Sequence, residues 1–230
     1  MKFLKFLIAL LLLPALYSLG RLALLLMGKV AQNGWPWIEM GTFSLGFSTC
    51  VFAYLCLPRG NWFYVLGHET THAFAVLLSG GRVSGFKVSS SGGHVISDRN
   101  SVWIALSPYF IPFYPMVSGL TWALALFIKP GLAVYDWAFL LIWGACWGFH
   151  LCHTLSLIKT EQPDFESQGY FFSFVVLALM NLLVAEVLIW CWLRPLPVEV
   201  VFQSLLNFLS EDYLFVLLLV KSVWSGIFQP

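Results

Sequence analysis

Charged residues are scarce in this sequence. Only 10% of its 230 residues are Asp, Glu, Lys or Arg, whereas 60% are hydrophobic. Soluble domains carry roughly 25% charged and 45–50% apolar residues. A soluble domain of this composition would therefore have too few polar side chains to form a hydrated surface. The formal net charge is only +1, which leaves no basic surface for nucleic acid. These deficits exclude soluble proteins and nucleic-acid-binding proteins and indicate an integral membrane protein.

Disulfide and zinc-ribbon patterns are also missing. The five cysteines all fall within apolar stretches, and an odd number at such positions argues against a disulfide framework. Their spacing contains no Cys-x-x-Cys pair, so we expect free thiols among apolar side chains. No internal repeat, low-complexity tract or soluble segment interrupts the chain. We therefore predict a single integral membrane domain over residues 1–230.

Long apolar runs fill most of the chain. A transmembrane helix needs about 20 predominantly apolar residues. Residues 196–212 are amphipathic and typical of a surface helix, and residues 213–228 form either a short last span or a re-entrant piece. The predicted fold class is an all-α polytopic membrane protein with six or seven transmembrane helices. Six of the apolar runs occupy residues 3–27, 41–57, 62–78, 102–127, 137–158 and 170–193.

One segment differs from the apolar runs. Residues 80–100, GGRVSGFKVSSSGGHVISDRN, alternate apolar and polar side chains and are rich in glycine and serine. Short alternating stretches on both sides of a Ser-Gly-Gly are typical of two antiparallel strands joined by a tight turn. We therefore predict a small β-hairpin over residues 83–96, directly after the third span.

The third span contains the sequence His68-Glu69-Thr70-Thr71-His72, an H-E-x-x-H motif. On a helix, residues i and i+4 lie on one face, so both imidazoles can reach one Zn²⁺ at about 2.0–2.1 Å. Glu69 can approach a water bound to that metal and accept its proton. The alternative is two histidines that hydrogen-bond to another helix, but it leaves Glu69 unpaired in hydrocarbon, which is costly. We therefore expect His68 and His72 to bind a metal.

A catalytic zinc with three protein ligands needs one more side chain. Residue type alone does not choose among the available ones. His150 and His153 lie on the fifth predicted span, where they can complete the site, orient another ligand, or only tie helices together by hydrogen bonds. The candidates outside the motif are His94, His150, His153, Asp164 and Glu186, followed by Asp98 and Asp136.

The stretch GHETTHAFAVLLSGGRVSGFKVSSSGGHV resembles the motif helix and following β-hairpin of the site-2 proteases, a family of intramembrane zinc metalloproteases. It is similar to their compact bacterial branch without a PDZ domain, in which H-E-x-x-H-A precedes a short apolar run and Gly-Gly-x-Val. The resemblance implies a protease core over residues 62–185 and an aspartate as the third zinc ligand, downstream in a proline-containing polar segment. Asp164, in the stretch QPDF, matches that place. The family's Leu-Asp-Gly is absent, however, and the next glycine is Gly169.

This resemblance implies hydrolysis of a peptide bond in or near a transmembrane segment of a membrane-protein substrate, as in regulated intramembrane proteolysis. One Zn²⁺ would be held by His68, His72 and Asp164, and Glu69 would be the catalytic residue. The implied location is the bacterial inner membrane, with the lipid bilayer and a transmembrane substrate as partners and no nucleic acid. Two alternatives stay open: a zinc-binding membrane protein without proteolytic activity, and a metal or solute transporter, which predicts several ligand sites along a path.

Two further features have both a structural and a functional interpretation. The hairpin is either a connector or an exposed strand edge that binds a locally unwound substrate by β-addition. The fourth span is broken around Ser107-Pro108-Tyr109 and again by Pro112 and Pro115. Because proline leaves carbonyl groups that a cavity or a neighbouring helix must satisfy, this break is either a packed kink or a water path to the metal.

Overall fold

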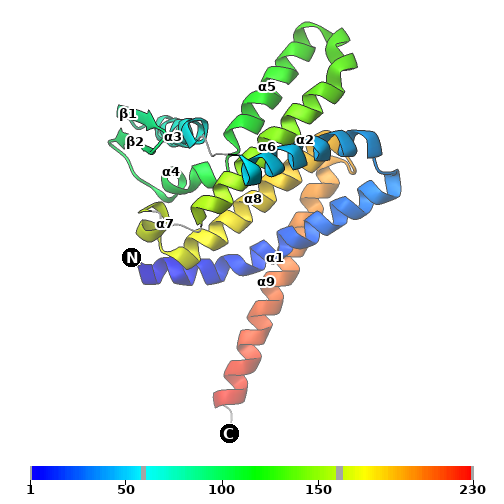
Figure 1. Cartoon of the computed structure of the whole chain (residues 1–230). Helices are drawn as coiled ribbons and strands as arrows, with labels where there is room; N and C mark the ends of the chain where they lie inside the picture. The colour runs from blue at the N-terminus through cyan, green and yellow to red at the C-terminus, as the bar shows by residue number, and fades with distance from the viewer. Residues whose placement is uncertain (1, 58–60, 159–162, 229–230) are drawn as a thin grey trace. The chain divides into compact units, whose positions relative to one another are not determined.

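A computed structural model describes residues 2–57, 61–158 and 163–228 (Figure 1). Within these ranges the protein is mostly helical and has one small antiparallel hairpin after α3, as predicted. The longer helices are α1 (Lys2–Asn33), α2 (Trp37–Cys56), α3 (Asn61–Leu78), α5 (Phe113–Ile128), α6 (Asp136–Ile158), α8 (Tyr170–Leu193) and α9 (Val198–Phe228). The shorter elements are β1 (Val83–Ser89), β2 (Gly92–Ser97), α4 (Val102–Leu106), η1 (Ser107–Tyr109), η2 (Pro130–Tyr135) and α7 (Pro163–Gln168).

Five helical segments of the described chain are long and apolar enough to cross a membrane: α1, α2, η2 with α6, α8, and α9. A sixth crossing results if α4–η1 and α5 together form one span, which bends by 76° at its break. The bend falls between Pro108 and Pro112, because proline cannot continue a helix without losing a hydrogen bond. The helix predicted as the third span, α3, is not in this set. The set as a whole is compatible with a multi-pass membrane protein.

Contacts divide the chain into two compact units, one formed by residues 1–35 with 168–230 and the other by residues 36–167. The division falls inside the predicted protease core of residues 62–185, since its last part, from Gln168, belongs to the first unit. The prediction of a single integral domain therefore stays a prediction, and the two units are described separately.

In the unit formed by both ends of the chain, α1 packs along α8 and against α9. The Lys5 amine donates a hydrogen bond to Gln168, just before α8 begins, and Asn33 donates one to the Pro195 carbonyl, just after α8 ends. These contacts join the start of α1 to the start of α8 and the end of α1 to the end of α8. The two helices therefore run parallel.

The same unit contains an ion-paired cluster between α1 and α9. Arg21 contacts Glu211 at 2.7 Å and Asp212 at 2.8 Å, and the Ser18 hydroxyl donates a hydrogen bond to Asp212. The sequence predicts a surface helix over residues 196–212 and a separate last piece over residues 213–228, whereas α9 is one helix. Charges in the middle of such a helix are tolerated when they are paired, and Arg21 provides this pairing.

In the unit of residues 36–167, α2 and α6 are the most closely packed helices. A Cβ on Gly46 would lie 1.9 Å from the Leu141 carbonyl oxygen, and a Cβ on Gly144 would lie 2.1 Å from the carbonyl oxygen of Phe43. Gly144 and Gly148 form a G-x-x-x-G pair, the spacing that lets membrane helices approach closely. Backbone contact of this kind fixes α2 and α6 as a rigid pair.

The directions of the helices in this unit bring several chain segments to one end. α2 and α6 run parallel, because Tyr54 near the end of α2 contacts His153 near the end of α6 with ring centroids 5.0 Å apart. Helix α5 runs antiparallel to α6, with Trp122 stacked on Phe139. Tyr64 of α3 stacks on His153 at 4.5 Å, so α3 begins where α2 and α6 end.

The hairpin packs on α3 with both strands. Strands β1 and β2 pair antiparallel, with Ser89 opposite Gly92 at the turn and Val83 opposite Ser97 at the open end. Gly80, with φ of +68°, leads the chain away from α3 in the left-handed conformation that favours glycine at helix ends. The observed strands lie within a residue or two of the predicted hairpin.

Candidate metal centre

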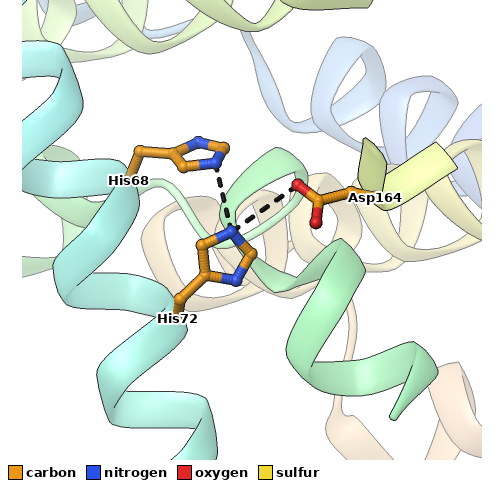
Figure 2. A group of neighbouring side chains, drawn as sticks. All are labelled: His68, His72 and Asp164. Atoms are coloured by element: carbon orange, nitrogen blue, oxygen red, sulfur yellow. Dashed lines mark hydrogen bonds and ion pairs between the residues drawn. The ribbon is translucent and has the colours of Figure 1, made fainter. Parts of the chain in front are cut away.

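His68 and His72 lie one turn apart on α3 and turn their rings toward the same point (Figure 2). Their Nε2 atoms are 3.2 Å apart and their ring planes are nearly perpendicular, at 80°. Two nitrogens bound to one zinc at about 2.0–2.1 Å in tetrahedral geometry would be roughly 3.3 Å apart. The observed spacing therefore fits two ligands of a shared ion.

Asp164 brings a carboxylate to the same point from a distant part of the chain. It is the second residue of α7, a short helix whose first position is Pro163, where proline is favoured. Its Oδ2 lies 3.6 Å from Nε2 of His72 (Figure 2). His68, His72 and Asp164 form a His/Asp group whose ligand atoms all lie within 4.8 Å of one another. The structure thus brings together the three residues that the sequence analysis expected to hold the metal.

The hydrogen bond of His72 fixes which of its nitrogens faces the centre. Nδ1 lies 2.7 Å from the backbone carbonyl oxygen of Ile104. A carbonyl only accepts hydrogen bonds, so Nδ1 must carry the hydrogen and the lone pair of the neutral ring lies on Nε2. If Nε2 of His68 also presents a lone pair, the two nitrogens repel each other at 3.2 Å unless a cation lies between them.

The other two residues of the group also have partners that fix their orientation. The Tyr64 hydroxyl lies 3.2 Å from Nδ1 of His68, and the Tyr109 hydroxyl donates a hydrogen bond of 2.9 Å to Oδ2 of Asp164. Metal-binding histidines almost always engage their second ring nitrogen in this way, and ligating carboxylates are also hydrogen-bonded. Each member of the group is therefore held by one defined contact outside it.

The electrostatics of Asp164 favour the form that binds a cation. Burial raises the pKa of the Asp164 carboxyl, but positive charge at Nε2 of His72, carried by a proton when no cation is bound, and the Tyr109 hydroxyl lower it by more, so its pKa lies below the usual range. The group is thus a carboxylate at neutral pH. An anionic oxygen and two imidazole nitrogens form a donor set typical of zinc.

Glu69 lies beside the group and is buried, with 7% of its surface exposed. Its side chain lines a cavity of about 700 Å³ that His68, His72 and Asp164 also line. Strand β2 lies directly against it: a Cβ on Gly93 would be 2.6 Å from Cγ of Glu69 and 2.6 Å from the Lys87 carbonyl oxygen. Only glycine at position 93 lets the strand come this close to the carboxyl group.

The other candidate ligands are not in the described group of three. His94 lines the 700 Å³ cavity but is exposed. Asp98 accepts a hydrogen bond from the Arg82 amide, and Asp136 accepts one from Trp122. Glu186 lies on α8, in the other unit.

His150 and His153, the main competitors, are buried on α6. His150 lines a small cavity with His68, and His153 stacks on Tyr64, which itself contacts His68. They therefore lie around the group rather than in it.

Sequence reasoning missed three contacts that orient the group. Tyr64 had a usable signal, because it lies four residues before His68 and hence on the same face of α3. Tyr109 belongs to the recognised proline break, but nothing in the sequence linked it to Asp164. The Ile104 contact is made by a backbone carbonyl, which leaves no residue signature.

Comparisons of the chain with models of protein families, with curated proteins and with solved structures gave no match.

Proposed function

We propose that this chain is a membrane-embedded zinc metalloprotease in which His68, His72 and Asp164 bind one Zn²⁺ and Glu69 is the catalytic acid–base residue. The observation that carries the proposal is the pair of Nε2 atoms, 3.2 Å apart, that face a carboxylate while a carbonyl holds Nδ1 of His72. Three protein ligands are typical of catalytic zinc, whereas structural zinc has four. A purely structural site would also have no use for Glu69.

The chain's own residues can perform the proton transfers that hydrolysis needs. A zinc ion held here would supply Lewis acidity, which activates water and polarises a peptide carbonyl. Glu69 lines the same cavity as the proposed ligands, so its carboxylate can accept a proton from the attacking water. The same carboxyl group then donates this proton to the amine that leaves as the peptide bond breaks.

The substrate that we propose is a transmembrane segment of another protein, locally unwound near the bond that is cut. A helix shields its carbonyls with its own hydrogen bonds, so it must open before hydrolysis. Strand β2 lines the cavity from Gly93 to Ser97 and belongs to a two-stranded sheet, so its outer edge can pair with an extended peptide. The resemblance to site-2 proteases supports the same substrate class.

The test of catalysis is Glu69→Gln, with Glu166→Gln as the matched control because Glu166 is an exposed carboxylate on α7. Purified proteins in detergent are incubated with a peptide mixture made from a proteome digest, and new termini are identified by mass spectrometry. We expect Glu69→Gln to keep one zinc per chain and to lose cleavage by at least ~10²–10⁴-fold. Unchanged cleavage in Glu69→Gln would refute the catalytic assignment.

The test of the metal site is the zinc content of single ligand variants. His68→Ala and Asp164→Ala should lose stoichiometric zinc, and His150→Ala should keep it. Loss of zinc only in His150→Ala would move the third ligand to α6. If proteoliposomes containing the wild type take up zinc and His72→Ala abolishes this uptake, the result would instead favour a transporter.

A further inference from the structure

A second cavity lies next to the candidate metal centre. It has a volume of about 380 Å³ and shares His68, Glu69 and Gly93 with the 700 Å³ cavity. Glu69 therefore lies at the boundary between two cavities. A volume of this size is well above the about 30 Å³ that one water occupies in the liquid, so it leaves room for a large amino-acid side chain.

We call this second cavity the serine–tyrosine pocket, because its walls, apart from His68 and Glu69, carry five hydroxyl groups and one imidazole. Two of the hydroxyls come from the hairpin turn, and the remaining polar groups come from helices that are otherwise mainly apolar. The residues that define the pocket are Tyr54, Tyr64, Ser90, Ser91, His153 and Ser156.

Aromatic contacts hold one wall of the serine–tyrosine pocket rigid. The His153 ring stacks face to face on Tyr64, with centroids 4.5 Å apart and planes 9° apart, and meets the Tyr54 ring edge-on at 5.0 Å. Tyr64 also contacts His68 through its hydroxyl. The pocket is therefore built onto the same side chains that orient the metal centre.

The path of β2 connects the two cavities. Residues 93–100 line the larger cavity, whereas residues 90–93 line the serine–tyrosine pocket. A peptide paired with β2 would advance about 3.3 Å per residue and pass from one cavity into the other beside Glu69. One residue next to the bond that is cut would then point its side chain into the serine–tyrosine pocket.

We propose that the serine–tyrosine pocket is a specificity site, which binds a neutral, hydrogen-bonding side chain (Ser, Thr, Asn, Gln or Tyr) next to the scissile bond of the substrate. This inference rests on the proposed protease function. Hydroxyl and imidazole groups can donate and accept hydrogen bonds with such a side chain. The Glu69 carboxylate at the boundary disfavours acidic residues, and an apolar residue would form no hydrogen bond with these polar walls.

The test compares cleavage profiles of the wild-type chain with those of Ser156→Leu and Ser91→Leu, using the same proteome-derived peptide mixture. Ser91 lies on the exposed hairpin turn, so its variant remains informative if the substitution in α6 disturbs folding. Ser204→Leu is the control, because Ser204 lies on α9 and its hydroxyl donates only to the Val200 carbonyl of its own helix. Zinc content confirms that each protein is intact.

We expect the wild type to prefer these polar side chains at one position next to the cut. The preference should fall about fivefold in both pocket variants, the size of effect that loss of one hydrogen bond brings, while other positions and Ser204→Leu keep the wild-type profile. A wild type that cleaves without this preference, or pocket variants with unchanged profiles, would overturn the specificity site and leave the protease function intact. A zinc-loaded wild type that cleaves nothing would overturn both.

Discussion

Tyr109 links two members of the candidate metal centre. Its hydroxyl donates to Asp164 at 2.9 Å, and its ring, fully buried, meets the His68 ring edge-on at 5.2 Å. It also packs on Phe165, the residue after Asp164, at 4.6 Å. A single side chain from the proline break thus sets the position of α7 relative to α3.

Tyr109→Phe should lower zinc affinity without unfolding the protein. The substitution keeps the ring but removes the hydroxyl that orients the Asp164 carboxylate, and loss of such a partner typically lowers metal affinity about 10–100-fold. Chelator competition measures the affinity, and the visible spectrum of the Co²⁺-substituted protein reports the ligand geometry. Tyr114→Phe is the control, because the Tyr114 hydroxyl bonds the Phe63 carbonyl instead. Equal affinities and spectra in both variants would show that Tyr109 does not position the ligand.

The parts of the site that sequence could predict are local ones. His68, Glu69 and His72 follow from the spacing of one motif on one helix turn. The role of Asp164 as third ligand was predicted only from a family resemblance, because its approach to His72 depends on how α7 packs. The contact between Tyr109 and Asp164 joins two chain segments that no pattern connects, and so it required the structure.

At the scale of elements, the hairpin depends on Gly93. Gly93→Ala would place a methyl group 2.6 Å from both Glu69 Cγ and the Lys87 carbonyl, so the strand must move away from α3. We expect a loss of about 1–3 kcal/mol in stability and a loss of cleavage, with zinc retained. Gly119→Ala is the control, because the nearest atom to its new Cβ is 3.7 Å away. Thermal unfolding measures the loss of stability, and the cleavage assay measures the loss of activity. If Gly93→Ala behaves like the wild type in both, the close contact between β2 and Glu69 is contradicted.

The pair α2 and α6 depends on its glycines in the same way. Gly144→Leu would force a side chain into the Phe43 carbonyl oxygen, 2.1 Å from the Cβ position. Because this oxygen belongs to the backbone of α2, it cannot move aside as a flexible side chain could. We expect destabilisation beyond about 3 kcal/mol, the upper end of ordinary overpacking, seen as loss of a monodisperse folded species in detergent. Gly119→Leu should stay folded. A stable Gly144→Leu variant would mean that α2 and α6 are farther apart than the structure places them.

Most elements were predictable because each has its own periodicity. The alternation of apolar and polar residues around the Ser-Gly-Gly predicts the hairpin. The apolar runs predict the first and last residues of α6 and α8 to within one residue. The errors occurred where a distant contact decides the outcome. Helix α9 continues through Glu211 and Asp212 because Arg21 pairs with them. Helix α7 was not predicted in the polar segment around Asp164, although Pro163 at its first position is a local signal for a helix start.

At the scale of the whole molecule, the helix directions predict how the chain crosses the bilayer. Helices α2 and α6 run parallel, so an odd number of crossings separates them. We predict that the bent α4–η1–α5 segment makes this crossing rather than α3, because α3 is not among the helices that are long and apolar enough to span a membrane. With α1, α2, α6, α8 and α9, this predicts six crossings, the upper number that the apolar helices allow.

Six crossings would place both chain ends on the same side of the membrane. The packing of the first unit agrees, because α1 runs parallel to α8 and α9 returns along α1. Epitope tags fused to each end should therefore be accessible, or protected, together in sealed vesicles, and both should become accessible after permeabilisation. Tags on opposite sides would imply five or seven crossings and would reopen the place of α3.

The unit formed by residues 1–35 and 168–230 is discontinuous in the chain, and this has a consequence for biosynthesis. α1 leaves the ribosome first, but its partners α8 and α9 emerge only after the whole other unit has been made. At ~5–20 residues per second, α1 must wait on the order of ten seconds with Arg21 unpaired in its apolar run. Nascent chains arrested before α8 should therefore need the insertion machinery or a chaperone to hold α1, whereas full-length chains should be released from it.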